Sequence, residues 1–222
     1  MHDRFQLHLV TDRKQARGDP AGAAAAAVRG GVDWVQVREK SGTARGLYET
    51  ALDLAPRSRT AGARLSVNDR VDVALATGAD GVHLAGKSLP PEVARGLVGA
   101  VVLGVSVHSL EEAREAVAAG ADYVTFGHVY PTSSKPGSPP RGVVELAEIV
   151  ESVEVPVLAV GGIEASSVRE VLKTGASGVA VISAVLAARS PEREAQRLRR
   201  ALDDSRHRPR HPFPEPTTRG AR

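Results

Sequence analysis

The sequence predicts an α/β protein built as a single (β/α)8 TIM barrel. Short β-branched runs alternate with longer alanine-rich segments that have helical spacing. One type of turn recurs between a helix and the next strand, as in Gly120-Ala121-Asp122-Tyr123 and Gly175-Ala176-Ser177-Gly178. Eight such units fit into about 200 residues. A doubly wound open sheet competes, but units of nearly equal length leave no obvious edge strand.

The expected strands are short and apolar, as parallel strands buried on both faces are. In chain order they are 5–11, 34–39, 64–68, 81–84, 103–107, 123–129, 155–160 and 178–182. The segments between them repeat apolar residues every three or four positions and are expected to be helices. These are 20–29, 43–59, 69–77, 90–97, 110–119, 142–151, 166–174 and 191–203. Helix start signals agree with two of these ranges. Ser109 precedes two glutamates, and Ser190-Pro191 opens the last segment.

Composition excludes several classes of protein. The 222 residues include no cysteine, which rules out disulfides, zinc–thiolate sites and thiol nucleophiles. No apolar run approaches the roughly 20 residues that cross a bilayer. The first residues lead directly into an expected strand, without the apolar core of a secretory signal. We therefore expect a cytoplasmic protein with no membrane partner.

The basic charge is concentrated at the C-terminal end. The chain has a net charge of +3, but residues 205–222 contain five arginines against Glu215. That segment carries +4, which leaves −1 for residues 1–204. Its proline, arginine and histidine content is too polar to form a core. We expect a barrel domain over 1–204, a disordered tail over 205–222 and no nucleic-acid partner.

Functional residues of such barrels lie on the loops that follow the carboxyl ends of the strands. The expected sixth strand carries His128 near its carboxyl end, and Thr132, Ser134 and Lys135 follow in the next loop. A histidine exchanges protons near neutral pH, and a lysine among hydroxyl groups binds a phosphate or carboxylate. The loop predicts acid–base chemistry on a small anionic substrate.

Other strand ends carry polar residues, each with a competing structural role. Arg38 and Lys40 share one face of the second strand, where a solvated strand end is the alternative. Asn68 precedes Asp69, which is also placed to cap the next helix. Ser106 and His108 share one face of the fifth strand, where a catalytic role of His108 competes with a helix-start or packing role. His8 and His83 have apolar neighbours and are interpreted as core histidines, and neither forms a metal-ligand pair.

Two further strand ends favour a phosphate site. Gly161-Gly162 follows the seventh strand, and Ile182-Ser183 ends the eighth. Paired glycines let backbone N–H groups approach an anion closely, and the helix starts that follow favour negative charge. The loops after strands 7 and 8 also form the recurring phosphate site of this architecture.

Together these segments resemble the thiamine phosphate synthase superfamily, and the resemblance runs collinearly over roughly residues 5–188. It implies a barrel that binds a phosphorylated thiazole at the loops after strands 7 and 8. The segments are Gln36-x-Arg38-Glu39-Lys40, Val67-Asn68-Asp69, Asp80-Gly81-Val82-His83-Leu84, Gly104-Val105-Ser106, Pro131-Thr132-x-x-Lys135 and Gly161-Gly162-Ile163.

The resemblance divides between two branches. Synthases hold magnesium with the aspartate of the Asn-Asp pair and a second aspartate after strand 4, where this chain has Ser88. They typically carry Gly-Pro where this chain has Gly127-His128. The segments around Ser106 and Phe126 are instead similar to TenI-type thiazole tautomerases, in which the strand 6 histidine transfers the proton.

We therefore expect a thiazole tautomerase of thiamine biosynthesis, an isomerase that needs no cofactor. His128 would move a proton of 2-carboxy-4-methylthiazol-5(2H)-ylidene ethyl phosphate and so make the thiazole ring aromatic. The substrate-binding set would be Arg38, Lys40, Asn68, Ser106, Thr132, Ser134, Lys135, Gly161, Gly162, Ile182 and Ser183.

Two alternatives stay open. One is a thiamine phosphate synthase that couples hydroxymethylpyrimidine diphosphate to thiazole phosphate and uses Mg²⁺. The other is a non-catalytic regulator that binds thiazole phosphate or thiamine phosphate. The expected partner is the small-molecule thiazole phosphate, and homodimer formation is left open.

Overall fold

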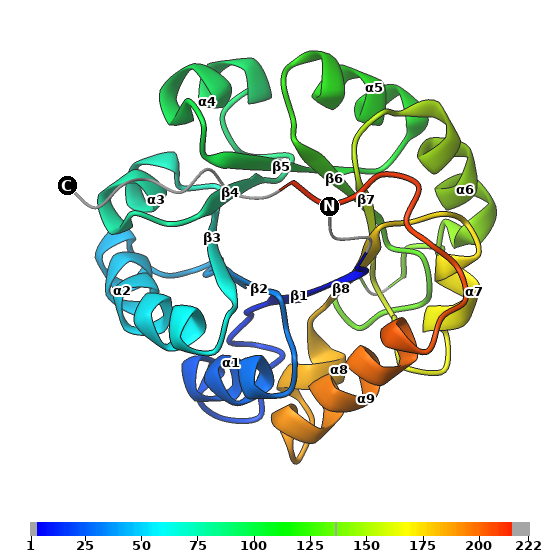
Figure 1. The fold of residues 1–222 in the computed structure, drawn as a ribbon. Helices are drawn as coiled ribbons and strands as arrows, with labels where there is room; N and C mark the ends of the chain where they lie inside the picture. Colours follow the sequence, from blue (N-terminus) through cyan, green and yellow to red (C-terminus); the bar gives the residue numbers. More distant parts are fainter. Residues whose placement is uncertain (1–3, 136, 215–222) are drawn as a thin grey trace.

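The computed structural model describes residues 4–135 and 137–214, and it confirms the predicted fold class (Figure 1). Parallel strands close into one barrel in chain order, with β8 paired to β1. The strands are β1 (Gln6–Val10), β2 (Trp34–Val37), β3 (Arg64–Asn68), β4 (Gly81–Leu84), β5 (Val102–Val107), β6 (Tyr123–Gly127), β7 (Val157–Val160) and β8 (Gly178–Val181).

Helices surround the barrel (Figure 1). They are α1 (Pro20–Arg29), α2 (Ala44–Thr60), α3 (Val71–Thr77), α4 (Pro91–Val98), α5 (Leu110–Ala118), α6 (Gly142–Ser152), α7 (Val168–Leu172), α8 (Ser183–Leu186) and α9 (Pro191–Asp203). The sequence pattern does not predict α8, because four residues are too few to show a helical period. Ser109 and Ser190 cap α5 and α9 through their side chains, as expected.

Strand alternation creates two apolar regions. Leu7 and Leu9 belong to the large core cluster that the helices cover. Trp34 and Tyr123 belong to a second cluster, packed with Val102 and Leu158. The buried His8 ring stacks on Trp34 with centroids 5.7 Å apart, in agreement with its interpretation as a core histidine.

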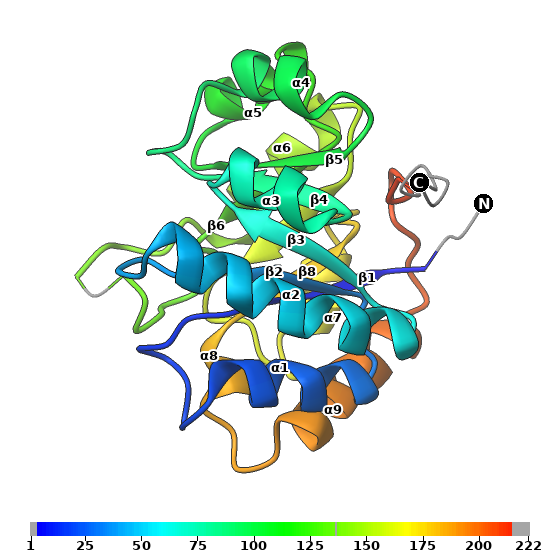
Figure 2. The same cartoon turned by 90° about the vertical axis from the view of Figure 1, so that its left-hand side faces the viewer.

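The segment after α9 returns across the amino end of the barrel, away from the loops that follow the strands (Figure 2). The Arg210 N–H donates to the Gly175 carbonyl at 3.0 Å, and the Ser177 hydroxyl donates to the His211 carbonyl at 2.7 Å. The Phe213 ring centroid lies 4.8 Å from that of Tyr123. Residues 205–214 thus differ from the expected disordered tail, because one aromatic ring reaches an apolar cluster. Residues 215–222 lie outside the described residues.

Within 4–135 and 137–214, no helix combines the length and the apolar character needed to cross a bilayer.

Candidate active site

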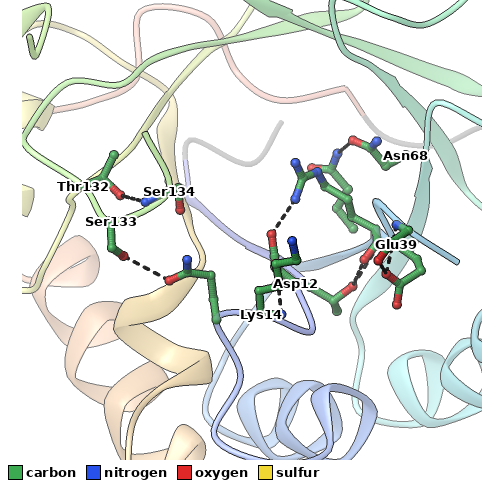
Figure 3. A network of polar contacts seen from close by, with 12 residues as sticks. Asp12, Lys14, Glu39, Asn68, Thr132, Ser133 and Ser134 are labelled. Atoms are coloured by element: carbon green, nitrogen blue, oxygen red, sulfur yellow. Dashed lines mark hydrogen bonds and ion pairs between the residues drawn. The ribbon is translucent and has the colours of Figure 1, made fainter. Parts of the chain in front are cut away.

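A cavity of about 450 Å³ opens at the carboxyl ends of the strands. It brings together every site residue predicted from the sequence, although the role of each stays a prediction. These residues are Arg38, Lys40, Asn68, Ser106, His128, Thr132, Ser134, Lys135, Gly161, Gly162, Ile182 and Ser183. Figure 3 shows Thr132 and Ser134 on one side, facing Asp12 and Asn68 on the other.

Arg38 is held in the cavity by an acidic residue that was not among the predicted site residues. Its guanidinium donates to a carboxylate oxygen of Asp12 at 2.7 Å, and both side chains are largely buried. The hydroxyl of Thr11 accepts from the Arg38 backbone N–H at 2.8 Å, which fixes the end of β2 beside β1. This anchoring pre-orients a planar group with several donors, which suits phosphate recognition.

A chain of amides and one carboxylate follows on the next strand ends. Gln36 Nε2 donates to Asn68 Oδ1 at 2.7 Å, and Asn68 Nδ2 donates to Asp69 Oδ2 at 2.6 Å. The other carboxylate oxygen of Asp69 accepts from the Ala85 N–H at 3.0 Å and from the Ser88 hydroxyl. Asp69 is therefore not the helix cap that its position also suggested, since Arg70 occupies the N-cap of α3.

The Asp69 backbone is itself unusual. Its φ of 60° places a non-glycine residue in the left-handed region. Residues in this conformation concentrate at functional sites, where the surrounding structure enforces it.

His83 lies between the core and the cavity. Its Nδ1 is 2.9 Å from the Tyr123 hydroxyl, and its Nε2 is 2.8 Å from the Ser106 hydroxyl. Burial lowers the pKa of His83 to about 4, so the ring is neutral at pH 7. The histidine is buried, as a core histidine should be, yet it also lines the cavity.

Lys135 is held at the mouth of the cavity. Its ammonium group donates to Nε2 of His108 at 2.8 Å, and the other ring nitrogen of His108 faces a carboxylate oxygen of Glu112 at 3.3 Å. Partial burial and the neighbouring Lys135 charge lower the pKa of His108, which keeps it an acceptor. His108 therefore contacts a cavity lysine instead of serving only at a helix start.

His128 has a buried ring with a structural contact. Its Nε2 donates to the Ser138 carbonyl at 3.2 Å, which ties the end of β6 to the following loop. In the described part of the chain, its Nδ1 atom has no hydrogen-bond partner. Neither ring nitrogen is thus bonded to a described carboxylate that would set the ring up as a proton shuttle.

The glycine pair after β7 allows close approach of the backbone. Gly161 and Gly162 have φ values of 99° and 67°. A Cβ at Gly161 would lie 2.3 Å from the Cβ of His128, and one at Gly162 would lie 2.4 Å from the Pro131 carbonyl oxygen. Only glycine fits there, and a glycine pair of this kind lets the backbone approach an anion closely.

The cavity is also lined by polar residues outside the predicted set, four of which come from the strands or from the loop after β1. Gln36, His83 and Thr125 point inward from their strands, and Asp12 follows β1. Strand period alone places Gln36 and Thr125 on the inner face. The partners of Asp12 and His83 are not visible in the sequence, because they come from other strands.

A magnesium ion, which the superfamily resemblance implies for synthases, would have to bind at Asp69. In the described residues, no group of three or more histidine and carboxylate side chains is arranged to hold a metal. Asp69 Oδ1 already accepts two hydrogen bonds, whereas Oδ2 accepts one and keeps a free lone pair. Magnesium is commonly held by one or two carboxylates together with substrate phosphates. The residues therefore fit an ion that is shared with a bound diphosphate.

Comparison with known proteins identifies relatives over almost the whole chain. The family model described as thiamine monophosphate synthase matches residues 7–185. A protein of Chloroflexus aurantiacus named thiamine-phosphate synthase is 44% identical, over 88% of this chain and 91% of its own. One of Pyrococcus furiosus with the same name is 41% identical, over 92% and 98%. The structure titled thiamine phosphate pyrophosphorylase from Pyrococcus furiosus superposes with a TM-score of 0.84, at 40% identity over 91% and 97% of the two chains.

These relatives contradict the tautomerase interpretation. Proteins 41% and 44% identical over most of the chain are named for the synthase reaction, so the expectation of a thiazole tautomerase, an isomerase, is wrong. That expectation depended on Ser88 and His128. Magnesium is commonly held by one or two carboxylates together with substrate phosphates, so Ser88 alone does not exclude a synthase. His128 has a structural contact with the Ser138 carbonyl.

Proposed function

Because this chain belongs to the thiamine monophosphate synthase family, we propose that it is a thiamine phosphate synthase. It would join hydroxymethylpyrimidine diphosphate to thiazole phosphate and release diphosphate. The observation that carries the proposal is a single cavity that holds a cluster of cationic side chains and, at other strand ends, a backbone cradle for an anion. Two phosphorylated substrates need two such regions.

The cationic region suits the diphosphate. Arg38, Lys40 and Lys135 line the cavity, and Arg38 and Lys135 are each held by a neighbouring side chain. Preorganised cations stabilise charge that develops on a leaving group without first having to reorient. We assign these three residues to the diphosphate of the pyrimidine substrate.

The backbone region suits the single phosphate. Gly161 and Gly162 follow β7, and Ser183 follows β8. Their N–H groups provide donors on two adjacent strand ends. We assign them to the phosphate of the thiazole, with its ring directed into the cavity toward the pyrimidine.

The bond changes need no proton shuttle. The thiazole ring nitrogen supplies an electron pair and forms a bond to the methylene carbon of the pyrimidine. The bond between that carbon and the diphosphate oxygen breaks, and the diphosphate leaves with the electron pair. The reaction places positive charge on the thiazole ring and negative charge on the leaving group, next to the assigned cations. Holding the two substrates in line supplies much of the remaining rate enhancement.

Asp69 would hold the magnesium ion through Oδ2, and the diphosphate would provide further ligands. When bound, Mg²⁺ neutralises diphosphate charge and so makes the diphosphate a better leaving group. Asn68 positions the carboxylate by donating to it, and Gln36 in turn holds the Asn68 amide.

The direct test incubates the purified protein with both substrates and Mg²⁺ and measures thiamine phosphate by chromatography. We expect stoichiometric formation of thiamine phosphate and diphosphate, and its loss in excess chelator. Turnover should also fall sharply in Lys135→Met and stay unchanged in Lys173→Met, which removes an exposed lysine at the end of α7. Absence of thiamine phosphate from correctly folded protein would refute the proposal.

A further inference from the structure

A row of buried hydrogen bonds crosses the barrel interior. It runs from the second apolar cluster, against which Phe213 packs, to the cavity. The Tyr123 hydroxyl lies 2.9 Å from Nδ1 of His83, and His83 Nε2 lies 2.8 Å from the Ser106 hydroxyl. Tyr123 and His83 are only 1% and 2% exposed, whereas Ser106 lines the cavity. A group remote from the substrates is thus connected to one that can touch them.

The direction of the first hydrogen bond follows from the need of the buried Tyr123 hydroxyl proton for an acceptor. Burial raises the pKa of Tyr123, so its hydroxyl keeps its proton. Within the described ranges, His83 is the sole hydrogen-bond partner of this hydroxyl. A buried hydroxyl proton without an acceptor is costly. Tyr123 therefore donates, and Nδ1 of His83 accepts.

The direction of the second bond follows from the first. A neutral imidazole carries one proton, so a ring that accepts at Nδ1 carries its hydrogen on Nε2. That N–H points to Ser106 Oγ at 2.8 Å, with Thr125 Oγ1 at 3.3 Å. Ser106 then accepts from His83, and its own proton is free to point to Thr125, 3.2 Å away, or into the cavity.

Two aromatic rings pack against the Tyr123 ring in the barrel interior. Its centroid lies 4.8 Å from the Phe213 ring and 5.7 Å from the His8 ring. The C-terminal segment thereby packs directly against Tyr123, the first residue of the hydrogen-bonded row. This packing restricts the tilt of the Tyr123 ring and so keeps its hydroxyl beside His83.

We propose that Tyr123 is a positioning residue: it holds His83 in the Nε2–H tautomer and, through it, turns Ser106 into a hydrogen-bond donor toward a diphosphate oxygen. The choice of diphosphate rests on the proposed synthase function. The tautomer and its effect on Ser106 follow from the contacts alone.

The tautomer is tested by NMR on protein labelled with ¹⁵N histidine at pH 7, with His83→Gln used to assign the signals. We expect His83 Nδ1 to resonate as an unprotonated nitrogen and Nε2 as a protonated one. In Tyr123→Phe, which keeps the ring but removes the hydroxyl, the two signals should move toward each other. A protonated Nδ1 in the wild type, or a spectrum unchanged in Tyr123→Phe, overturns the proposal.

The link to Ser106 is tested by a double-mutant cycle on the affinity for inorganic diphosphate with Mg²⁺, measured by calorimetry. Loss of one neutral hydrogen bond should weaken binding roughly two- to tenfold in Tyr123→Phe. The double variant with Ser106→Ala should bind no more weakly than Ser106→Ala alone, because Tyr123 acts through that hydroxyl. Additive losses would show an independent, purely structural role and overturn the proposal.

A matched control removes the same atom elsewhere. Tyr48 lies on α2 and is 36% exposed. The Tyr48→Phe variant should bind diphosphate like the wild type. A failure of the synthase proposal would be distinguishable, because thiamine phosphate would not form, yet NMR would still show the His83 tautomer and its dependence on the Tyr123 hydroxyl.

Discussion

A Cβ placed on Gly161 would lie 2.3 Å from the Cβ of His128, so the loop after β7 and the end of β6 meet without room for a methyl group. The positive φ of Gly161 adds a second barrier to any other residue. The two loops that line this side of the cavity are consequently packed as a unit.

Gly161→Ala should therefore damage both stability and catalysis. We expect a loss of roughly 1–3 kcal/mol in the free energy of unfolding and a large rise in KM for thiazole phosphate. Gly96→Ala in α4, where a Cβ meets nothing within 4 Å, should be neutral or slightly stabilising. Denaturant titration and steady-state kinetics measure both, and a Gly161→Ala variant that behaves like Gly96→Ala would disprove the packing argument.

Ser88→Asp should strengthen magnesium binding. It places a second carboxylate beside Asp69, where the serine hydroxyl now donates to Oδ1. The magnesium concentration for half-maximal binding of diphosphate should fall, as measured by calorimetry, and Asp69→Asn should raise it. Ser190→Asp adds the same charge at the N-cap of α9 and should change neither. An unchanged magnesium requirement in Ser88→Asp would contradict the assignment of Asp69.

Replacing Arg38 should weaken binding of the pyrimidine substrate. A hydrogen bond to a charged group is worth about 1.5–3 kcal/mol, so Arg38→Met should raise KM for the diphosphate substrate roughly 10- to 100-fold. Asp12→Asn should have a smaller effect in the same direction, because it only loosens the guanidinium. Arg57→Met, which breaks an exposed pair on α2, is the control. Equal KM values for Arg38→Met and Arg57→Met would exclude Arg38 from the site.

Stability should decrease in acid because of the buried histidines. The pKa of His83 is about 4 in the native state, against 6.5 for an unperturbed histidine, so the unfolded chain binds the extra proton first. The contribution is fully present above pH 6.5 and is lost as the pH falls toward 4, on the order of 3 kcal/mol. Burial also lowers the pKa of His8, which acts in the same direction. Thermal unfolding between about pH 7.5 and 4.5 should show this slope, reduced in His83→Gln; an equal slope in both proteins would count against it.

Removal of the C-terminal segment should destabilise the barrel. A chain that ends at Asp204 loses the Phe213 ring and the two backbone contacts of Arg210 and His211. We expect a melting temperature lower by several degrees, since about 1 kcal/mol corresponds to about 2–4 °C in a protein of this size. The matched control ends at Pro214 and keeps every described contact. If both truncated chains melt together, the segment contributes no stability.

Most of the fold could be predicted from the sequence because strand and helix periods are local properties. Each expected strand, from 5–11 to 178–182, has a counterpart in the barrel. The predicted site residues share one cavity, since loops at the carboxyl ends of parallel strands converge. Contacts between distant segments were not accessible in this way. The Asp12–Arg38 pair, the Tyr123–His83–Ser106 chain and the docking of Phe213 all join residues from different parts of the chain.

The wrong prediction of a thiazole tautomerase has a related cause. Ser88 and His128 differ from the residues typical of synthases, but the sequence does not show what either side chain contacts. In the folded chain, the Ser88 hydroxyl donates to the Asp69 carboxylate, and His128 anchors a loop through Ser138. A changed residue at a motif position is informative only when its new contacts are known.

The beginning of β1 and the segment that carries Phe213 lie at the same end of the barrel (Figure 2). The cavity lies at the other end, where the strands have their carboxyl ends. A solid support or a fused enzyme joined through either segment would leave that opening facing the solvent. Immobilised or tandem versions of this protein should therefore exchange reactants as freely as the isolated chain.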